Sequence, residues 1–193
     1  MKSLDRGIWC SSISLVTKLR LYNVYILPVL LYGSDTWSVT EAMRQRLDAF
    51  DQWCLRRILR VSYTAHVTNV SVRSQTDQPP VSSLIQQRHL KLFGHIARAA
   101  ASEDHSRALW ASTDRLPVDC RRPRGRPRQS WLWTIDNDLK PLNLGLHSAL
   151  RRATDRPSWR RIVETAMLFE CATRWWWWWW PFAASHSPAG PDR

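Results

Sequence analysis

Apolar residues recur every three or four positions through most of the chain, and this spacing restricts the fold more than any other feature. The clearest run lies within residues 40–61, where the spaced apolar residues are Met43, Leu47, Phe50, Cys54, Ile58 and Val61. Such spacing places side chains on one face of an α-helix. Alternating runs of β-branched residues, which are typical of strands, are rare. The sequence therefore predicts a mostly α fold built of small helical, bundle-like modules.

The helix expected over residues 40–61 has two distinct faces. Phe50 stands at the centre of the apolar face, which we expect to be buried. The opposite face, which we expect to meet solvent, carries Arg44, Asp48, Asp51, Arg56 and Arg60. Ser38 and Thr40 are candidate N-caps, and Ser38 with Glu41 fits a capping box.

Further helices are predicted in residues 9–31, 81–100, 105–111, 129–139, 146–153 and 158–172, with one short helix from about residue 68. Pro28 should kink or end the first of these. Gly94 lies inside the helix over 81–100, where it costs ~1 kcal/mol relative to Ala, so we expect a packing or turn requirement there. Asp155 is the natural N-cap of the last helix.

The chain is strongly basic, mainly through arginine. It has 28 Lys and Arg residues against 16 Asp and Glu residues, and only four of the 28 are lysine. The planar guanidinium group matches phosphate geometry and stacks on bases, so this excess favours contact with RNA or DNA. The alternative is a solvated basic surface without a partner.

Two arginine clusters are the candidate nucleic-acid contacts. The first lies in a proline-rich loop over 116–128 and comprises Arg121, Arg122, Arg124, Arg126 and Arg128. Its Pro-Arg-Gly-Arg-Pro core resembles an AT-hook and so predicts either insertion into an A·T-rich minor groove or a disordered basic linker. The second cluster comprises Arg151, Arg152, Arg156, Arg160 and Arg161. Trp159 lies within it, either stacked on a base or packed into the core.

No motif for catalysis or metal binding stands out. The histidines are scattered, no phosphate-cradling glycine loop is found, and Asp136 and Asp138 would face apart on a helix. The four cysteines are far apart and form no C-x-x-C pair, so neither a zinc knuckle nor a disulfide framework is predicted. We expect reduced thiols in an intracellular protein that binds no metal and no cofactor.

The hydrophobic segments do not fit a membrane protein. The most apolar run, residues 21–33, contains Pro28 and is shorter than the roughly 20 residues that a span needs, and no signal peptide follows Met1. Residues 175–180 are six consecutive tryptophans within a low-complexity tail, 173–193, which we expect to be disordered. The alternative for these rings is an anchor at a membrane surface.

Six segments within residues 15–165 carry a family resemblance. They are 27–37 (LPVLLYGSDTW), 47–61 (LDAFDQWCLRRILRV), 67–70, 87–98 (QRHLKLFGHIAR), 125–138 (GRPRQSWLWTIDND) and 149–163 (ALRRATDRPSWRRIV). Together, in this order and spacing, they resemble the C-terminal part of the reverse transcriptase of a non-long-terminal-repeat retrotransposon, a long interspersed element. The resemblance is specific because several motifs occur in order.

The resemblance implies a division of the chain. Residues 1–61 would form a thumb-like helical segment, and residues 62–115 and 129–172 a helical C-terminal module around the basic loop. In that family the metal-binding aspartates lie in the palm, upstream of this region, and the Tyr-x-Asp-Asp motif is absent from this sequence. The remaining polymerase portions are therefore candidate partners, and the expected location is the nucleus.

One position departs from the family pattern. After Arg128 the family resembles Trp-x-Asp-x-Ile, whereas this chain has Trp133 in place of the acid. The tail after about residue 174 has no counterpart in the family. Both features indicate a truncated and decayed copy.

These observations predict a catalytically incompetent fragment of a retroelement reverse transcriptase that binds RNA or DNA through its arginine clusters. The alternative is a helical protein-interaction or structural remnant with no nucleic-acid role.

We expect the purified chain to have neither polymerase nor nuclease activity with Mg²⁺ or Mn²⁺. The reason is that two-metal phosphoryl chemistry needs a carboxylate cluster, and none of the motifs above supplies one. Primer extension and nuclease assays on a homogeneous sample would check this. Template-dependent nucleotide addition would contradict it.

Overall fold

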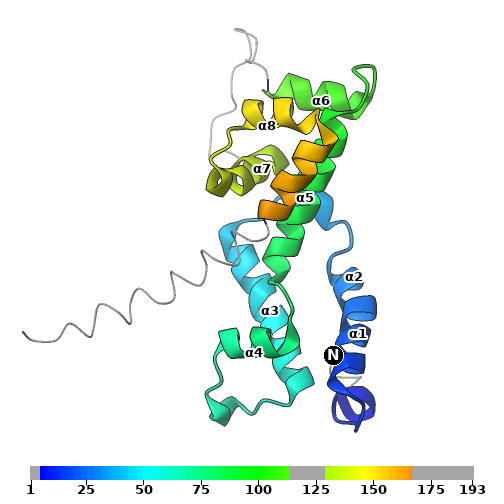
Figure 1. Ribbon diagram of the computed structural model, residues 1–193, viewed down its shortest axis with the longest axis vertical. Helices are drawn as coiled ribbons and strands as arrows, with labels where there is room; N and C mark the ends of the chain where they lie inside the picture. The colour runs from blue at the N-terminus through cyan, green and yellow to red at the C-terminus, as the bar shows by residue number, and fades with distance from the viewer. Residues whose placement is uncertain (1–4, 114–128, 167–193) are drawn as a thin grey trace, which may run out of the picture.

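The computed structural model describes residues 5–113 and 129–166, and this part of the chain is helical without any strand (Figure 1). The prediction of a mostly α fold is therefore confirmed. The arginine loop from 116 to 128 and the tryptophan-rich tail lie outside the described residues. No helix in the described part combines the length and apolar character that crossing a membrane requires.

The N-terminal helical stretch changes its winding before Pro28. After a short π-helix at Asp5–Trp9, α1 (Leu15–Leu21) continues into a π-helix at Tyr22–Ile26 and then into α2 (Leu27–Leu30). Pro28 sits in the first turn of α2, directly after the π-helix. The proline thus interrupts the regular α-helix without ending the helical stretch. Gly33 follows at a φ of 65°, in the left-handed region that glycine adopts without strain.

The helix α3 (Glu41–Leu59) begins at Thr40, whose hydroxyl accepts a hydrogen bond from the Met43 N–H at 3.1 Å. Thr40, and not Ser38, is therefore the N-cap. A one-turn 3₁₀ helix, Ser34–Thr36, precedes this start. At its other end α3 closes on Arg60 in the left-handed conformation.

The predicted buried face of α3 is confirmed at Cys54 and Ile58 and is wrong in its N-terminal half. Phe50 is 40% exposed and packs against the neighbouring Trp53 ring, whereas Arg44 and Asp51 on the supposedly solvated face are buried. Both buried charges have partners on distant segments, described below. Pairing of these two charged side chains with distant residues therefore decided which face of α3 is buried there, against the local apolar spacing.

The remaining elements follow the sequence pattern closely. They are a 3₁₀ turn at Tyr63–Ala65, α4 (Asn69–Thr76), α5 (Val81–Ala97), α6 (Asp104–Thr113), α7 (Trp131–Leu139), a 3₁₀ turn at Lys140–Leu142, α8 (Leu146–Ala153) and a last helix described over 156–166. Asp155 immediately precedes the last helix, and its carbonyl accepts the Trp159 N–H at 2.9 Å.

The long helix α5 runs along the centre of the molecule and joins its two ends (Figure 1). At one end its C-terminal half packs with α6, α7, α8 and the last helix around Phe93, Ile135 and Trp159. At the other end α3 and α4 pack with the N-terminal stretch around Tyr22 and Leu55. A smaller apolar cluster at the start of α5 lies between these two cores.

Gly94 has the packing role that its position predicted. A Cβ at this residue would lie closer than 3.0 Å to the Trp159 ring, a separation that real Cβ atoms essentially never show. The Trp159 indole N–H in turn donates to the Leu90 carbonyl on α5 at 2.9 Å, and its ring lies 5.6 Å from that of Phe93. The glycine therefore allows the last helix to lie against α5.

We predict that Gly94→Ala will lower the free energy of unfolding by about 1–3 kcal/mol, the usual effect of overpacking a core. In an unconstrained helix the same change would stabilise by ~1 kcal/mol. Gly7→Ala is the control, because nothing lies within 4 Å of a Cβ there. Urea unfolding followed by circular dichroism measures both. A Gly94→Ala protein more stable than the parent would contradict this packing.

Candidate functional site

Asp138 is the centre of a buried polar network that joins three helices. Its carboxylate accepts a hydrogen bond from the Arg44 guanidinium of α3 and lies 3.1 Å from the His89 Nδ1 of α5. The Gln86 amide nitrogen, also on α5, donates to the Asp138 backbone carbonyl at 3.0 Å. Charges this deeply buried are tolerated because each is paired and hydrogen-bonded.

The His89–Asp138 pair has the geometry of two members of a hydrolytic triad but not the surroundings. His89 is 0% exposed, and its second ring nitrogen, Nε2, has no hydrogen-bond partner in the described structure. A general base must reach the proton of a nucleophile or of water. The geometry of this pair therefore supports a structural role, in which it fixes α5 and α7 relative to each other, and not a catalytic one.

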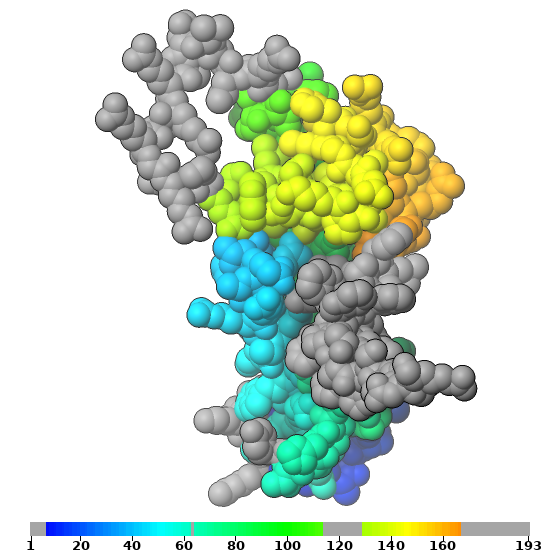
Figure 2. Space-filling model, turned by 90° about the vertical axis from the view of Figure 1, so that its left-hand side faces the viewer, coloured from blue at the N-terminus to red at the C-terminus, as the bar shows by residue number. Residues whose placement is uncertain are grey.

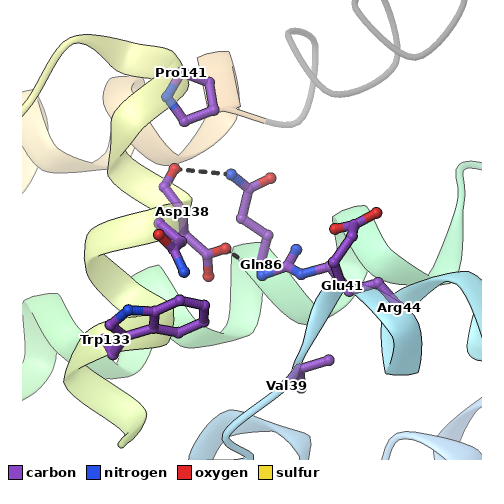
Figure 3. A pocket seen from close by; sticks show the side chains of 8 residues that line it. Val39, Glu41, Arg44, Gln86, Trp133, Asp138 and Pro141 are labelled. Atoms are coloured by element: carbon purple, nitrogen blue, oxygen red, sulfur yellow. Dashed lines mark hydrogen bonds and ion pairs between the residues drawn. The ribbon is translucent and has the colours of Figure 1, made fainter. Parts of the chain in front are cut away.

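A pocket of about 330 Å³ opens beside this network (Figure 3). Its lining comes from the start of α3, from α5, and from α7 with the turn after it: Val39, Glu41, Arg44, Gln86, Trp133, Asn137, Asp138 and Pro141. We call it the Trp133 pocket. Two hydrogen bonds hold α7 in place at this junction, from Trp131 Nε1 to the Asp35 carbonyl and from Gln129 Nε2 to the Val39 carbonyl, both at 2.8 Å. Figure 2 shows the segment at the start of α3, in light blue, in direct contact with α7, in yellow-green.

A second pocket, of about 380 Å³, is lined by the turn after α7, by α8 and by the last helix, and it carries two arginines of the predicted binding cluster. Arg152 on α8 and Arg161 on the last helix both line it, with Asn143, Ser158 and Thr165 among the polar lining residues. We call it the arginine pocket. Both arginines are exposed, and neither forms an ion pair within the described parts of the chain. Two such guanidinium groups beside hydroxyl and amide groups can bind a phosphate.

The other predicted site residues are spread more widely. Arg156 lies near Arg98, and its charge lowers the pKa of the Arg98 guanidinium, which burial already lowers. Arg151 and Arg160 are exposed but line neither pocket. The loop arginines Arg121, Arg122, Arg124, Arg126 and Arg128 lie outside the described residues.

Much of the arginine excess has a structural role that sequence reasoning missed. Arg88 donates to the Leu31 carbonyl at the end of α2, and Arg98 donates to the Ala153 carbonyl at the end of α8, both at 2.7 Å. These groups satisfy carbonyls that have no partner inside the helix. Arg56 and Arg60 bind backbone carbonyls in the same way. Trp159, the aromatic residue of the second cluster, is buried in the core and offers no face for stacking.

A second buried network ties α3 to the N-terminal stretch and to α4. The Tyr22 hydroxyl donates to one Asp51 carboxylate oxygen at 2.5 Å, and Arg73 of α4 donates to the other at 2.8 Å. Burial raises the pKa of Asp51 against the opposing effects of Tyr22 and Arg73, and it raises the pKa of Tyr22 well above its usual range. Burial also raises the pKa of the neighbouring Cys54 to about 12, so this thiol is protonated and unreactive at neutral pH.

Comparison with known proteins gives one informative similarity. A protein of Caenorhabditis elegans, described as uncharacterized and transposon-derived, is 26% identical over 128 residues, which are 63% of this chain and 44% of that protein. The chain thus spans less than half the length of this relative. No family model and no solved structure matches the chain. The similarity supports a transposon-related origin and carries no information about activity.

We predict that Asp138→Asn will destabilise the fold by about 3–5 kcal/mol, because it removes the buried negative charge that pairs with the Arg44 guanidinium across the helix junction. Asp136→Asn is a matched control on the same helix. Asp136 pairs with the exposed Lys140 one turn away, at 3.6 Å, and such a pair contributes ~0.5 kcal/mol or less. Denaturant midpoints compare the two. Equal midpoints would mean that Asp138 does not hold the helices together.

Proposed function

We propose that this chain is a remnant of the C-terminal part of a retroelement reverse transcriptase and that it binds RNA or DNA through phosphate contacts without performing catalysis itself. The transposon-derived relative and the ordered motifs of the sequence support this origin. Two of those motifs also meet in space, because Trp131 hydrogen-bonds to Asp35 across the helix junction. A fold that joins the motifs agrees with their descent as one unit.

The observation that carries the binding proposal is the arginine pocket. Arg152 and Arg161 come from different helices and share one concave surface without an acidic partner in the described structure. The buried and half-buried arginines of the described helices bind carbonyl or carboxylate groups. Arg152 and Arg161 differ from them, because they share a concave surface and have no such partner in the described structure. Phosphate contacts of this kind release counterions and supply most of the non-specific affinity for nucleic acid.

The alternative, a protein-interaction remnant, is favoured by one other surface. Along the N-terminal stretch and the turn after it, four apolar side chains are between 65% and 85% exposed: Val16, Tyr25, Val29 and Tyr32. Exposed apolar groups of this size are typical of surfaces that pack against another protein. Because this surface is apolar, it would suit another protein better than a phosphate backbone.

We predict that Arg152→Ala with Arg161→Ala will weaken duplex DNA binding and flatten the slope of log affinity against log salt by up to ~0.9 for each phosphate that is no longer bound. Fluorescence anisotropy at several salt concentrations measures this slope. Arg20→Ala is the control, since Arg20 is an exposed arginine on α1 that lines neither pocket.

The outcomes separate the two functions. An unchanged salt slope in the double variant would remove the arginine pocket from the binding surface. A parent chain that binds neither duplex nor single strands would leave the protein-interaction function as the better account.

A further inference from the structure

We propose that the Trp133 pocket holds one unstacked base of a single-stranded nucleic acid whose phosphate occupies the arginine pocket. This inference rests on the proposed function and adds to it a preference for single strands. Three observations carry it: an exposed aromatic ring, an unpartnered buried acceptor, and a residue shared by the two pockets.

Trp133 is the aromatic ring of the pocket. It is 51% exposed on α7, although α7 is otherwise well packed against α5. The pocket's volume of about 330 Å³ is at the lower end of the range for small-ligand sites. An exposed tryptophan beside such a cavity is a platform on which a base of any sequence can stack.

Gln86 supplies the unpartnered acceptor. Its amide nitrogen must face the Asp138 carbonyl, because that carbonyl can only accept, so its Oε1 is turned away from Asp138 (Figure 3). Gln86 is only 2% exposed, and this oxygen has no hydrogen-bond partner in the described structure. A buried acceptor of this kind is costly unless a donor reaches it. The exocyclic amine of adenine, cytosine or guanine is such a donor.

Asn137 adds a second amide at the edge of the pocket. Its Oδ1 accepts a hydrogen bond from Lys140 Nζ at 2.6 Å, which leaves the amide nitrogen as a donor. A carboxamide donor and a carboxamide acceptor together match the mixed edge that a base presents. Neither group carries a charge, so their preference is for a base over a phosphate.

The electrostatics of the two pockets assign them different parts of one nucleotide strand. In the Trp133 pocket the guanidinium group of Arg44 is paired with Asp138, so its charge is already neutralised by a carboxylate. The arginine pocket has two guanidinium groups without an acidic partner in the described structure. Pro141 lines both pockets, so they adjoin at the turn after α7. A strand crossing Pro141 would place phosphate on one side and a base on the other.

The test compares Trp133→Ala with Trp53→Ala in the full chain. Trp53 is a similarly exposed tryptophan that lines neither pocket. At a rise of 1.5 Å per residue it lies about 13 Å further along α3 than Arg44, which lines the Trp133 pocket. The probes are a short single-stranded DNA, the same strand with abasic sites, and the corresponding duplex. Affinities come from fluorescence anisotropy, and circular dichroism monitors the fold.

We expect Trp133→Ala to weaken binding of the intact single strand by about 5- to 150-fold, the affinity factor associated with stacking of one base. Binding of the abasic strand and of the duplex should not change, and the salt slope should stay that of the parent, because the substitution removes no charge. Trp133→Phe should restore most of the affinity, whereas Trp133→Leu should not. Trp53→Ala should bind as the parent does.

The inference is overturned if the parent binds the abasic strand as tightly as the intact strand, or if Trp133→Ala and Trp53→Ala bind alike. Its failure differs from failure of the proposed function, in which no nucleic acid binds with a salt-dependent affinity. If Trp133→Ala loses helical signal, the test is the affinity of Trp133→Phe against that of Trp133→Leu, and equal affinities of these two variants overturn the inference.

Discussion

The pairing of Asp138 with Arg44 and His89 is the constraint on which the arrangement of the helices depends. These residues lie on α7, α3 and α5, and each is buried. In a low-dielectric interior a charge without its partner costs several kcal/mol, so the pairing favours the register in which the three helices meet here. That register places α7 over the start of α3, and the Trp133 pocket is the space that remains beside the junction.

The same requirement explains how a very basic chain forms helical cores. Arg88 and Arg98 satisfy the carbonyl ends of α2 and α8, and Asp48 of α3 accepts from both the backbone N–H and the hydroxyl of Ser82 at the start of α5. Polar side chains thus act as helix caps from neighbouring helices. Net charge alone is therefore a poor guide to the binding surface. Arg152 and Arg161 differ from these arginines because they have neither a carbonyl nor an acidic partner in the described structure.

Local features of the sequence predicted much of the fold, and long-range pairing accounts for what they missed. The apolar spacing located α5 and α8, with α8 at Leu146–Ala153 as expected, and the mid-helix Gly94 correctly indicated close packing. The prediction for α3 failed in its N-terminal half, where Arg44 is buried because it pairs with a residue 94 positions away. No local pattern encodes that partner. For the same reason the clustering of arginines indicated Arg152 and Arg161 but not the pocket that they share.

Trp133 and Asp138 lie on the same helix, but an apolar ring would have a different consequence at each position. At Asp138 such a ring would remove the carboxylate that pairs with Arg44 and His89, and the junction between the helices would be disrupted. Trp133 lies on the same helix but is half exposed, so a ring there removes no buried partner and adds an aromatic wall to an existing pocket. The fold therefore accommodates a large ring at position 133. This ring leaves the buried network of Asp138 intact and shares its pocket with the amides of Gln86 and Asn137, so the rigid junction of the helices also fixes the shape of the pocket.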